Sequence, residues 1–149
     1  MAVKAVPDNF HTVTPYLVIS GVSKLIDFLK QTFDAQEVVR MGPPGGPVMH
    51  AEVKIGDSMV MMGEAGGPNP AMPNTLYVYV ADVDTVYKKA LAAGATSIKE
   101  PANAFYGDRS CAVKDPSGNH WGIATHIEDV SPEEMKKRMA AAMQQQASS

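Results

Sequence analysis

The apolar positions of this chain recur with a period of two in some stretches and with a helical period in others. Residues 75–80 (TLYVYV) alternate, so that Leu76, Val78 and Val80 share one face of a strand while the threonine and the tyrosines share the other. Residues 83–91 follow with apolar side chains at helical spacing. The two patterns predict a strand followed by a helix that covers the aliphatic face of the strand.

This strand–helix pattern occurs twice in the chain. Residues 16–22 (YLVISGV) lead into a helical pattern in the same way as residues 77–83 (YVYVADV). In each copy two further strands are joined by a tight turn, IGDS at 55–58 and DPSGN at 115–119, with the residue types that turns require. The repeat predicts two modules, each built as strand, helix, strand, strand, strand.

Glycine and proline separate the two copies, and a helix start follows the second. Residues 65–74 contain too much of both for the interior of a helix or strand. Ser131 suits a helix N-cap, and Pro132 suits the first helical position. We expect a single domain over residues 1–149, with module one at about 11–64, a linker at 65–74, module two at 75–126 and a C-terminal helix at 131–145.

Composition narrows the class of protein and its location. Of the 149 residues 45% are hydrophobic and 19% charged, which is typical of a compact domain, and a formal net charge of −3 with scattered basic residues argues against nucleic-acid binding. The single cysteine, Cys111, excludes an intrachain disulfide. Because the N-terminal residues lack the apolar run of a signal peptide and no segment is long enough to span a bilayer, we expect a cytoplasmic protein without a membrane partner.

Strand alternation also predicts the side chains on the face opposite the helices, which we call the cup face. Trp121 and Ile123 are expected on the helix side of their strand. The residues expected on the cup face are Thr14, Tyr16, Val18, His50, Glu52, Lys54, Thr75, Tyr77, Tyr79, Ser110, Ala112, Lys114, His120, Gly122, Ala124 and His126. Both histidines of the stretch HWGIATH are therefore expected on the cup face.

The duplicated module, the sequence VADVD at 80–84 and the turn DPSGN at 115–119 resemble the vicinal oxygen chelate superfamily, which contains glyoxalase I, bleomycin and fosfomycin resistance proteins and extradiol dioxygenases. The likeness covers about residues 11–126, and the segments 106–109 and 125–134 look like a functionally obscure, glyoxalase-like branch. The resemblance implies an α+β fold in which both modules form a curved mixed sheet, a cup around the active site with the helices outside.

The resemblance also bears on cofactors. Metal-dependent members of the superfamily carry one ligand near the start of the first strand and one on the last strand of each module, drawn from His, Gln and Glu. Carried over to this sequence, the positions are Thr14, Met62, Thr75 and Gly122, none of which is a good metal ligand. The expected cofactor is therefore none. A divalent metal held outside this pattern by His50, Glu52 and His120 stays open, since histidine and carboxylate bind zinc, iron or manganese.

Two functions follow from these observations, and whether the protein is an enzyme stays open between them. The first is a metal-free binding protein that holds a small aromatic or anionic molecule in the cup. Its expected lining is Tyr16, Met62, Tyr77, Tyr79, Phe105, Tyr106, Gly122 and His126, with Arg109 as the candidate partner for an anionic group.

The second is a lyase or isomerase of glyoxalase type. Here His50 or His120 is the general base, and Glu52 orients the base or takes its proton. Both functions are compatible with a homodimer, because paired modules in this superfamily often assemble across a two-fold axis.

Overall fold

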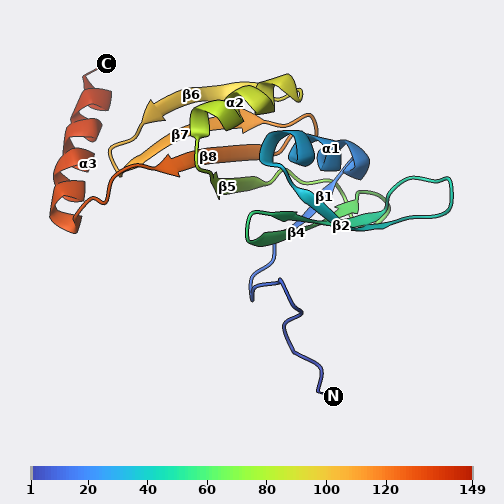
Figure 1. Ribbon diagram of the computed structural model, residues 1–149. Helices are drawn as coiled ribbons and strands as arrows, with labels where there is room; N and C mark the ends of the chain where they lie inside the picture. The colour runs from blue at the N-terminus through green and yellow to red at the C-terminus, as the bar shows by residue number, and fades with distance from the viewer. Residues whose placement is uncertain (1, 149) are drawn as a thin grey trace.

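The alternating and helical patterns become eight strands and three helices within residues 2–148, the part of the chain that the computed structural model describes (Figure 1). Module one contains β1 (Tyr16–Ile19), α1 (Val22–Phe33), β2 (Gln36–Met41), β3 (His50–Ile55) and β4 (Ser58–Glu64). Module two contains β5 (Thr75–Tyr79), α2 (Val83–Ala92), β6 (Thr96–Asn103), β7 (Asp108–Lys114) and β8 (His120–His126), and α3 (Pro132–Ala147) follows. The predicted α+β class, with two βαβββ modules and a C-terminal helix, is confirmed.

Each module keeps its own four-stranded sheet, with the order β1-β4-β3-β2 in the first and β5-β8-β7-β6 in the second. The first and last strands of a module pair in parallel, and the other neighbouring strands pair antiparallel. The modules contact each other through α1 and α2, and the ring of Phe33 at the end of α1 lies 5.5 Å from the ring of Trp121 on β8. The strands thus form two mixed sheets, whereas the resemblance implies one curved sheet.

The core lies on the helix side of both sheets. In module one Leu25, Ile26 and Leu29 of α1 are buried in the same cluster as Ala51 and Val53 of β3. Complete burial of such an aliphatic side chain stabilises the fold by about 1.5–3 kcal/mol. In module two Trp121 and Ile123 are fully buried in this cluster, as strand alternation predicts.

A difference in turn length shifts the register between the two modules. Four residues separate Lys54 of β3 from its partner Met59 of β4, whereas five separate Lys114 of β7 from its partner His120 of β8. The last strands of the two modules are therefore offset by one residue relative to the strands before them. In module two Gly122 pairs with Tyr77, and in module one Met61, not Met62, pairs with Tyr16. The structural counterpart of Gly122 is therefore Met61.

The predicted position of Met62 on the cup face is consequently wrong. Met62 is fully buried and pairs with Leu17 and Ala51, both of which belong to the helix-side core. Paired residues of neighbouring strands share a face, so the Met62 side chain lies in the core of module one. Met61 takes the position on the cup face, beside Tyr16 and Glu52.

Helix α3 extends from the end of module two (Figure 1), and hydrogen bonds and ion pairs connect it to the rest of the chain. Its first turn is capped by Ser131, whose hydroxyl accepts the Glu134 N–H at 3.2 Å, and it runs two residues beyond the expected end. None of its residues, all of which the structure describes, is fully buried. Arg138 connects it to the body by donating to the Glu128 carboxylate and to the Phe105 carbonyl.

No helix within residues 2–148 is both long and apolar enough to cross a membrane.

Candidate functional site

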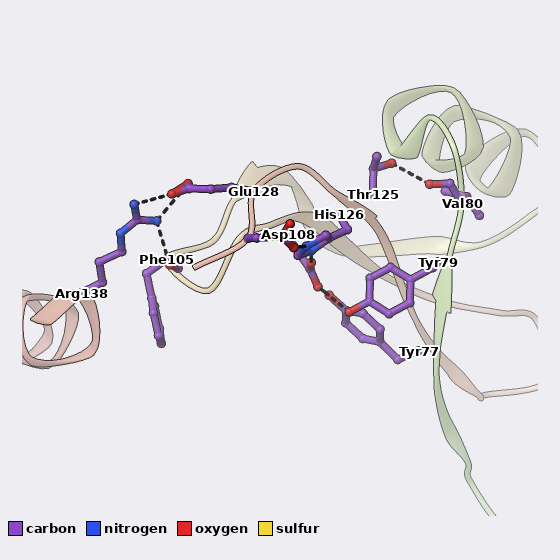
Figure 2. Close-up of polar contacts among 10 residues, drawn as sticks. Tyr77, Tyr79, Val80, Phe105, Asp108, Thr125, His126, Glu128 and Arg138 are labelled. Atoms are coloured by element: carbon purple, nitrogen blue, oxygen red, sulfur yellow. Dashed lines mark hydrogen bonds and ion pairs between the residues drawn. The ribbon is translucent and has the colours of Figure 1, made fainter. Parts of the chain in front are cut away.

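A buried carboxylate joins two tyrosines and a histidine on the cup face of module two. The hydroxyls of Tyr77 and Tyr79 both donate to Oδ2 of Asp108, at 2.8 and 2.9 Å, and Nδ1 of His126 lies 2.9 Å from Oδ1 (Figure 2). Asp108 is only 3% exposed. The sequence produces this arrangement because Asp108 begins β7 directly opposite His126, the last residue of β8. We call Tyr77, Tyr79, Asp108 and His126 the tyrosine site.

The ring of His126 lies between two carboxylates. Its Nε2 is 2.7 Å from Oδ1 of Asp129, while Nδ1 faces Asp108. Two acceptors favour the imidazolium, which donates from both nitrogens. The hydrogen bond to Asp108, followed by the one to Asp129, therefore raises the pKa of His126 above its ordinary value.

Asp108 stays ionised in spite of its burial. Burial alone would raise the pKa of its carboxyl group, but hydrogen bonds from His126, Tyr77 and Tyr79 outweigh burial and hold the pKa below its ordinary value. The same carboxylate acts on the phenols. The pKa of Tyr77 is raised by burial and by Asp108, and that of Tyr79 is raised first by Asp108. Both tyrosines are therefore neutral donors at physiological pH.

The rings of the two tyrosines remain accessible. Their centroids lie 5.3 Å apart in an edge-to-face arrangement, and Tyr77 and Tyr79 are 47% and 62% exposed. The hydroxyl ends are thus anchored on Asp108 (Figure 2), while ring surface remains exposed to solvent. Two oriented aromatic rings offer apolar contact area to a flat ligand.

The glycine on β8 makes room for this arrangement. A Cβ added to Gly122 would lie 2.7 Å from Cδ2 of Tyr77, closer than non-bonded carbons can approach. The same relationship recurs in module one, where a Cβ at Gly63 would lie 2.7 Å from the Tyr16 hydroxyl. In module two, the position that the resemblance assigns to a metal ligand is therefore covered by an aromatic ring.

A second polar chain lies on the cup face of module one. The Tyr16 hydroxyl is 3.3 Å from Nδ1 of His50, and Nε2 of His50 is 3.0 Å from Oε2 of Glu52. His50 and Glu52 project from the same side of β3 because they are two residues apart, as predicted. The two contacts orient the imidazole and place a carboxylate beside it, an arrangement suited to a general base.

His120 stands apart from both groups. It pairs with Thr75 at the start of β8 and is exposed, while His126 closes the other end of the same strand. Within residues 2–148 no three His, Cys, Asp or Glu side chains are grouped as a metal ion would require. The structure therefore does not assemble His50, Glu52 and His120 into the shared site considered from the sequence.

Arg109 lies on the opposite face from the tyrosines and does not join the tyrosine site. Its Nε and Nη2 donate to the two carboxylate oxygens of Asp84, each at 2.9 Å, and Nη1 donates to Asn103. Arg109 pairs with Thr125, whose hydroxyl accepts the N–H of Val83 at the start of α2. This places the guanidinium on the helix side, where Asp84 occupies it in a bidentate ion pair.

Phe105 and Tyr106 occupy the connection between β6 and β7. Their rings meet edge to face with centroids 5.4 Å apart, and Tyr106 also contributes to the raised pKa of Tyr77. The Phe105 carbonyl accepts from Arg138, so this connection is linked to α3 (Figure 2). Both aromatics thus lie near the tyrosine site, at its α3 end.

Two carboxylates with defined roles were missed from the sequence. Alternation that assigns Ser110 and Ala112 to the cup face extends to Asp108, so the signal for Asp108 was present. The second is Glu64, whose carboxylate oxygens accept the N–H groups of Gly21 and Val22 at 2.9 and 3.1 Å. Glu64 therefore caps α1, and nothing in the local sequence indicates a cap from so distant a residue.

An apolar cavity of about 640 Å³ lies between the modules, beside the tyrosine site. Its walls include Leu76 and Val78 of β5 and the adjacent Val80, together with Phe33 and Trp121. β5 is the edge strand of its sheet, so its outer backbone groups are not used by the second sheet. The cavity follows this sheet edge, and Tyr77 and Tyr79 of the tyrosine site also belong to its walls.

Comparison with known proteins agrees with the resemblance seen in the sequence. The family model described as Glyoxalase/Bleomycin resistance protein/Dioxygenase superfamily matches residues 10–123. The uncharacterized proteins Mb0911c of Mycobacterium bovis and Rv0887c of Mycobacterium tuberculosis are each 31% identical over 140 residues, which span 87% of this chain and 92% and 82% of theirs.

Solved structures reproduce the fold. TioX from Micromonospora sp. ML1 aligns with a TM-score of 0.69 and 24% identity over 78% of this chain and 99% of its own. The fosfomycin resistance protein FosX from Listeria monocytogenes, solved with Mn(II) and sulfate, aligns with a TM-score of 0.63 and 17% identity over 87% of this chain and 97% of its own. At these identities the likeness extends to the fold alone.

Proposed function

This chain belongs to the glyoxalase/bleomycin resistance protein/dioxygenase superfamily, and on that premise we propose that it binds a small aromatic molecule on the cup face without the usual metal site. The observation that carries the proposal is the contact between Tyr77 and Gly122. It places an aromatic ring at the position where metal-dependent members of the superfamily carry a metal-ligating side chain. In this chain the position supports stacking rather than coordination.

The tyrosine site has the features of a binding surface for a flat molecule. Tyr79 exposes more than half of its surface, and its hydroxyl is fixed by Asp108, so little side-chain entropy would be lost on binding. Binding of an anionic molecule, the other possibility considered from the sequence, loses its main support because Arg109 is paired with Asp84 on the other face.

A calorimetric titration with a neutral bicyclic aromatic, 1-naphthylmethanol, tests the proposal. We expect saturable binding that Tyr79→Ala weakens about fivefold, the loss of one stacking ring. Tyr87→Ala is the matched control, because it removes a tyrosine outside the tyrosine site. Tyr87 lies on α2, and its hydroxyl donates a hydrogen bond to Ser97 on the helix side. Absence of binding, or equal weakening by both substitutions, would contradict the proposal.

We further propose that the functional form is a homodimer. β5 offers a free edge with an apolar cavity beside it, and α3 exposes Met139 and Met143. Exposed apolar surface of this kind is typical of subunit contacts. Sedimentation velocity across a concentration series is the test: a dimer is expected at micromolar protein, and a monomer throughout the series would oppose it.

A second candidate function, a lyase or isomerase of glyoxalase type, is favoured by the contact between His50 and Glu52 at 3.0 Å. An oriented imidazole is suited to remove a proton next to a carbonyl. Exchange of α-protons of small hydroxyketones in D2O, followed by NMR, tests this role. Catalysed exchange that is lost in His50→Gln and kept in His120→Gln would favour the enzyme, and absence of exchange would leave the binding protein.

A further inference from the structure

We infer that the tyrosine site selects aromatic molecules that carry a cationic amine, an inference that rests on the binding function proposed above. The argument comes from what lies behind the two rings. The Asp108 carboxylate accepts the hydroxyl protons of Tyr77 and Tyr79 and is almost completely buried. Each phenol oxygen has thus donated its proton inward and keeps its lone pairs for a donor on a ligand.

The accessible surface of the site attracts positive charge for a second reason. The faces of phenol rings carry partial negative charge, and a cation within about 6 Å of a ring centroid is attracted to it. The Asp108 carboxylate, which is within hydrogen-bond reach of both hydroxyls, adds to this negative potential. Because the carboxylate is buried, water and salt screen its charge less than they screen an exposed charge. An ammonium group would contact the rings without desolvating Asp108 itself.

The charges around the site sum to a negative value. Asp108 and Asp129 face the two nitrogens of His126, so a protonated ring leaves two negative charges against one positive charge. The basic residues of the same region are engaged elsewhere: Arg109 pairs with Asp84 on the helix side, and Arg138 pairs with Glu128 and Glu134 at α3.

Lysines of the cup face lie at the far end of the strands. Lys114 ends β7, whereas Asp108 begins it, which separates them by roughly 20 Å at the usual strand rise. Lys54 lies at the corresponding end of β3 in the other module. At the tyrosine site a carboxylate ligand would therefore be repelled by Asp108, with no lysine near enough to compensate. An amine would be attracted by the same negative charge.

Three probes that share one ring system isolate the charge preference. They are 1-naphthylmethylammonium, 1-naphthylmethanol and 1-naphthoate, titrated by calorimetry at neutral pH and low salt. We expect the ammonium to bind about fivefold more tightly than the alcohol, and the carboxylate more weakly than both. Equal affinities for ammonium and alcohol, or tightest binding of naphthoate, would overturn the inference while the binding function stands. Binding of none of the three would remove the binding function itself.

Two variants test the source of the preference. Asp108→Asn should abolish the advantage of the ammonium over the alcohol, and Asp84→Asn, which makes the same change in net charge on the opposite face, should keep it. Because replacement of a buried carboxylate can disturb folding, His126→Gln provides an independent reading. Removal of the imidazolium beside Asp108 should increase the ammonium advantage about twofold, and an unchanged or smaller advantage would overturn the inference.

Discussion

The ring of Tyr77 lies against the backbone of Gly122, so that a Cβ on Gly122 would be 2.7 Å from Cδ2 and 3.3 Å from Cε2 of the ring. The hydroxyl of the same tyrosine is fixed on Asp108 at 2.8 Å. A side chain at Gly122 can be accommodated only if Tyr77 moves, and that movement breaks the bond to Asp108. A metal-ligating residue at Gly122 and the tyrosine site are therefore alternatives that exclude each other.

Substitution of Gly122 by alanine should destabilise the protein because the new methyl group overlaps the Tyr77 ring. We expect a loss of about 1–3 kcal/mol in the free energy of unfolding, measured by urea denaturation. Gly66→Ala is the control, since an added Cβ there meets nothing within 4 Å among the described residues. The double variant Gly122→Ala with Tyr77→Ala should lose less than the sum of the single changes, and full additivity would argue against the contact.

Stability should depend on pH through His126 and Asp108 in opposite senses. The pKa of His126 is raised above its ordinary 6.5, so its contribution is fully present below that pH and is lost as the pH rises through the folded-state value. The pKa of Asp108 lies below its ordinary 3.8, so its contribution is present above that pH and is lost as the pH falls.

Urea denaturation between about pH 4 and pH 9 should therefore show the highest free energy of unfolding on the acidic side of neutrality. In His126→Gln the decline toward alkaline pH should flatten, because the titrating group is absent. His120→Gln serves as the control, since His120 lies at the other end of the strand and is exposed. An unchanged decline in His126→Gln would refute the assignment to His126.

Replacement of Glu64 should weaken the start of α1. Both of its carboxylate oxygens accept backbone N–H groups, at Gly21 and Val22, so Glu64→Ala leaves two donors unsatisfied. A loss of roughly 1–2 kcal/mol is expected in the free energy of unfolding. Thr125→Val in module two removes one acceptor from Val83 and should have a smaller effect. Equal losses of unfolding free energy in Glu64→Ala and Thr125→Val would contradict the expectation that a cap with two hydrogen bonds contributes more than a cap with one.

Release of α3 should leave the two modules intact. Arg138→Ala removes the contacts to Glu128, Glu134 and the Phe105 carbonyl that hold a helix without buried residues. Hydrogen exchange measured by mass spectrometry should reveal faster exchange in α3 and little change in the sheets. Lys137→Ala, one residue earlier, tests whether loss of any positive charge on this helix has the same effect. Uniform acceleration throughout the chain would contradict a local role.

The fold could be predicted from the sequence because the periodic patterns are local and occur twice. Alternation in residues 75–80 identified which face of β5 is aliphatic, and the repeated tight turns indicated where strands reverse. The assignment of Met62 to the cup face failed for a specific reason. Carrying a register across turns of unequal length moves every later side chain to the other face of the strand.

The candidate site was only partly accessible to sequence reasoning. His126 and the tyrosines were assigned to one face by periodicity, but their convergence on Asp108 depends on pairing between strands that are distant in the chain. Arg109 was selected for its charge, although alternation from Ser110 assigns it to the helix side. Where chemistry and periodicity pointed to different faces, periodicity was the better guide.

The different caps of the two module helices have a consequence for the order of folding. Asp82 caps α2 from within its own segment, by accepting the N–H of Thr85. In α1 the N-cap is Gly21, which has no side chain, and the acceptor arrives only when β4 delivers Glu64. Helix α2 can therefore begin from local sequence, whereas α1 is complete only after a long loop has closed. Although the modules share the same order of strands and helix, we expect α2 to form earlier than α1 during folding.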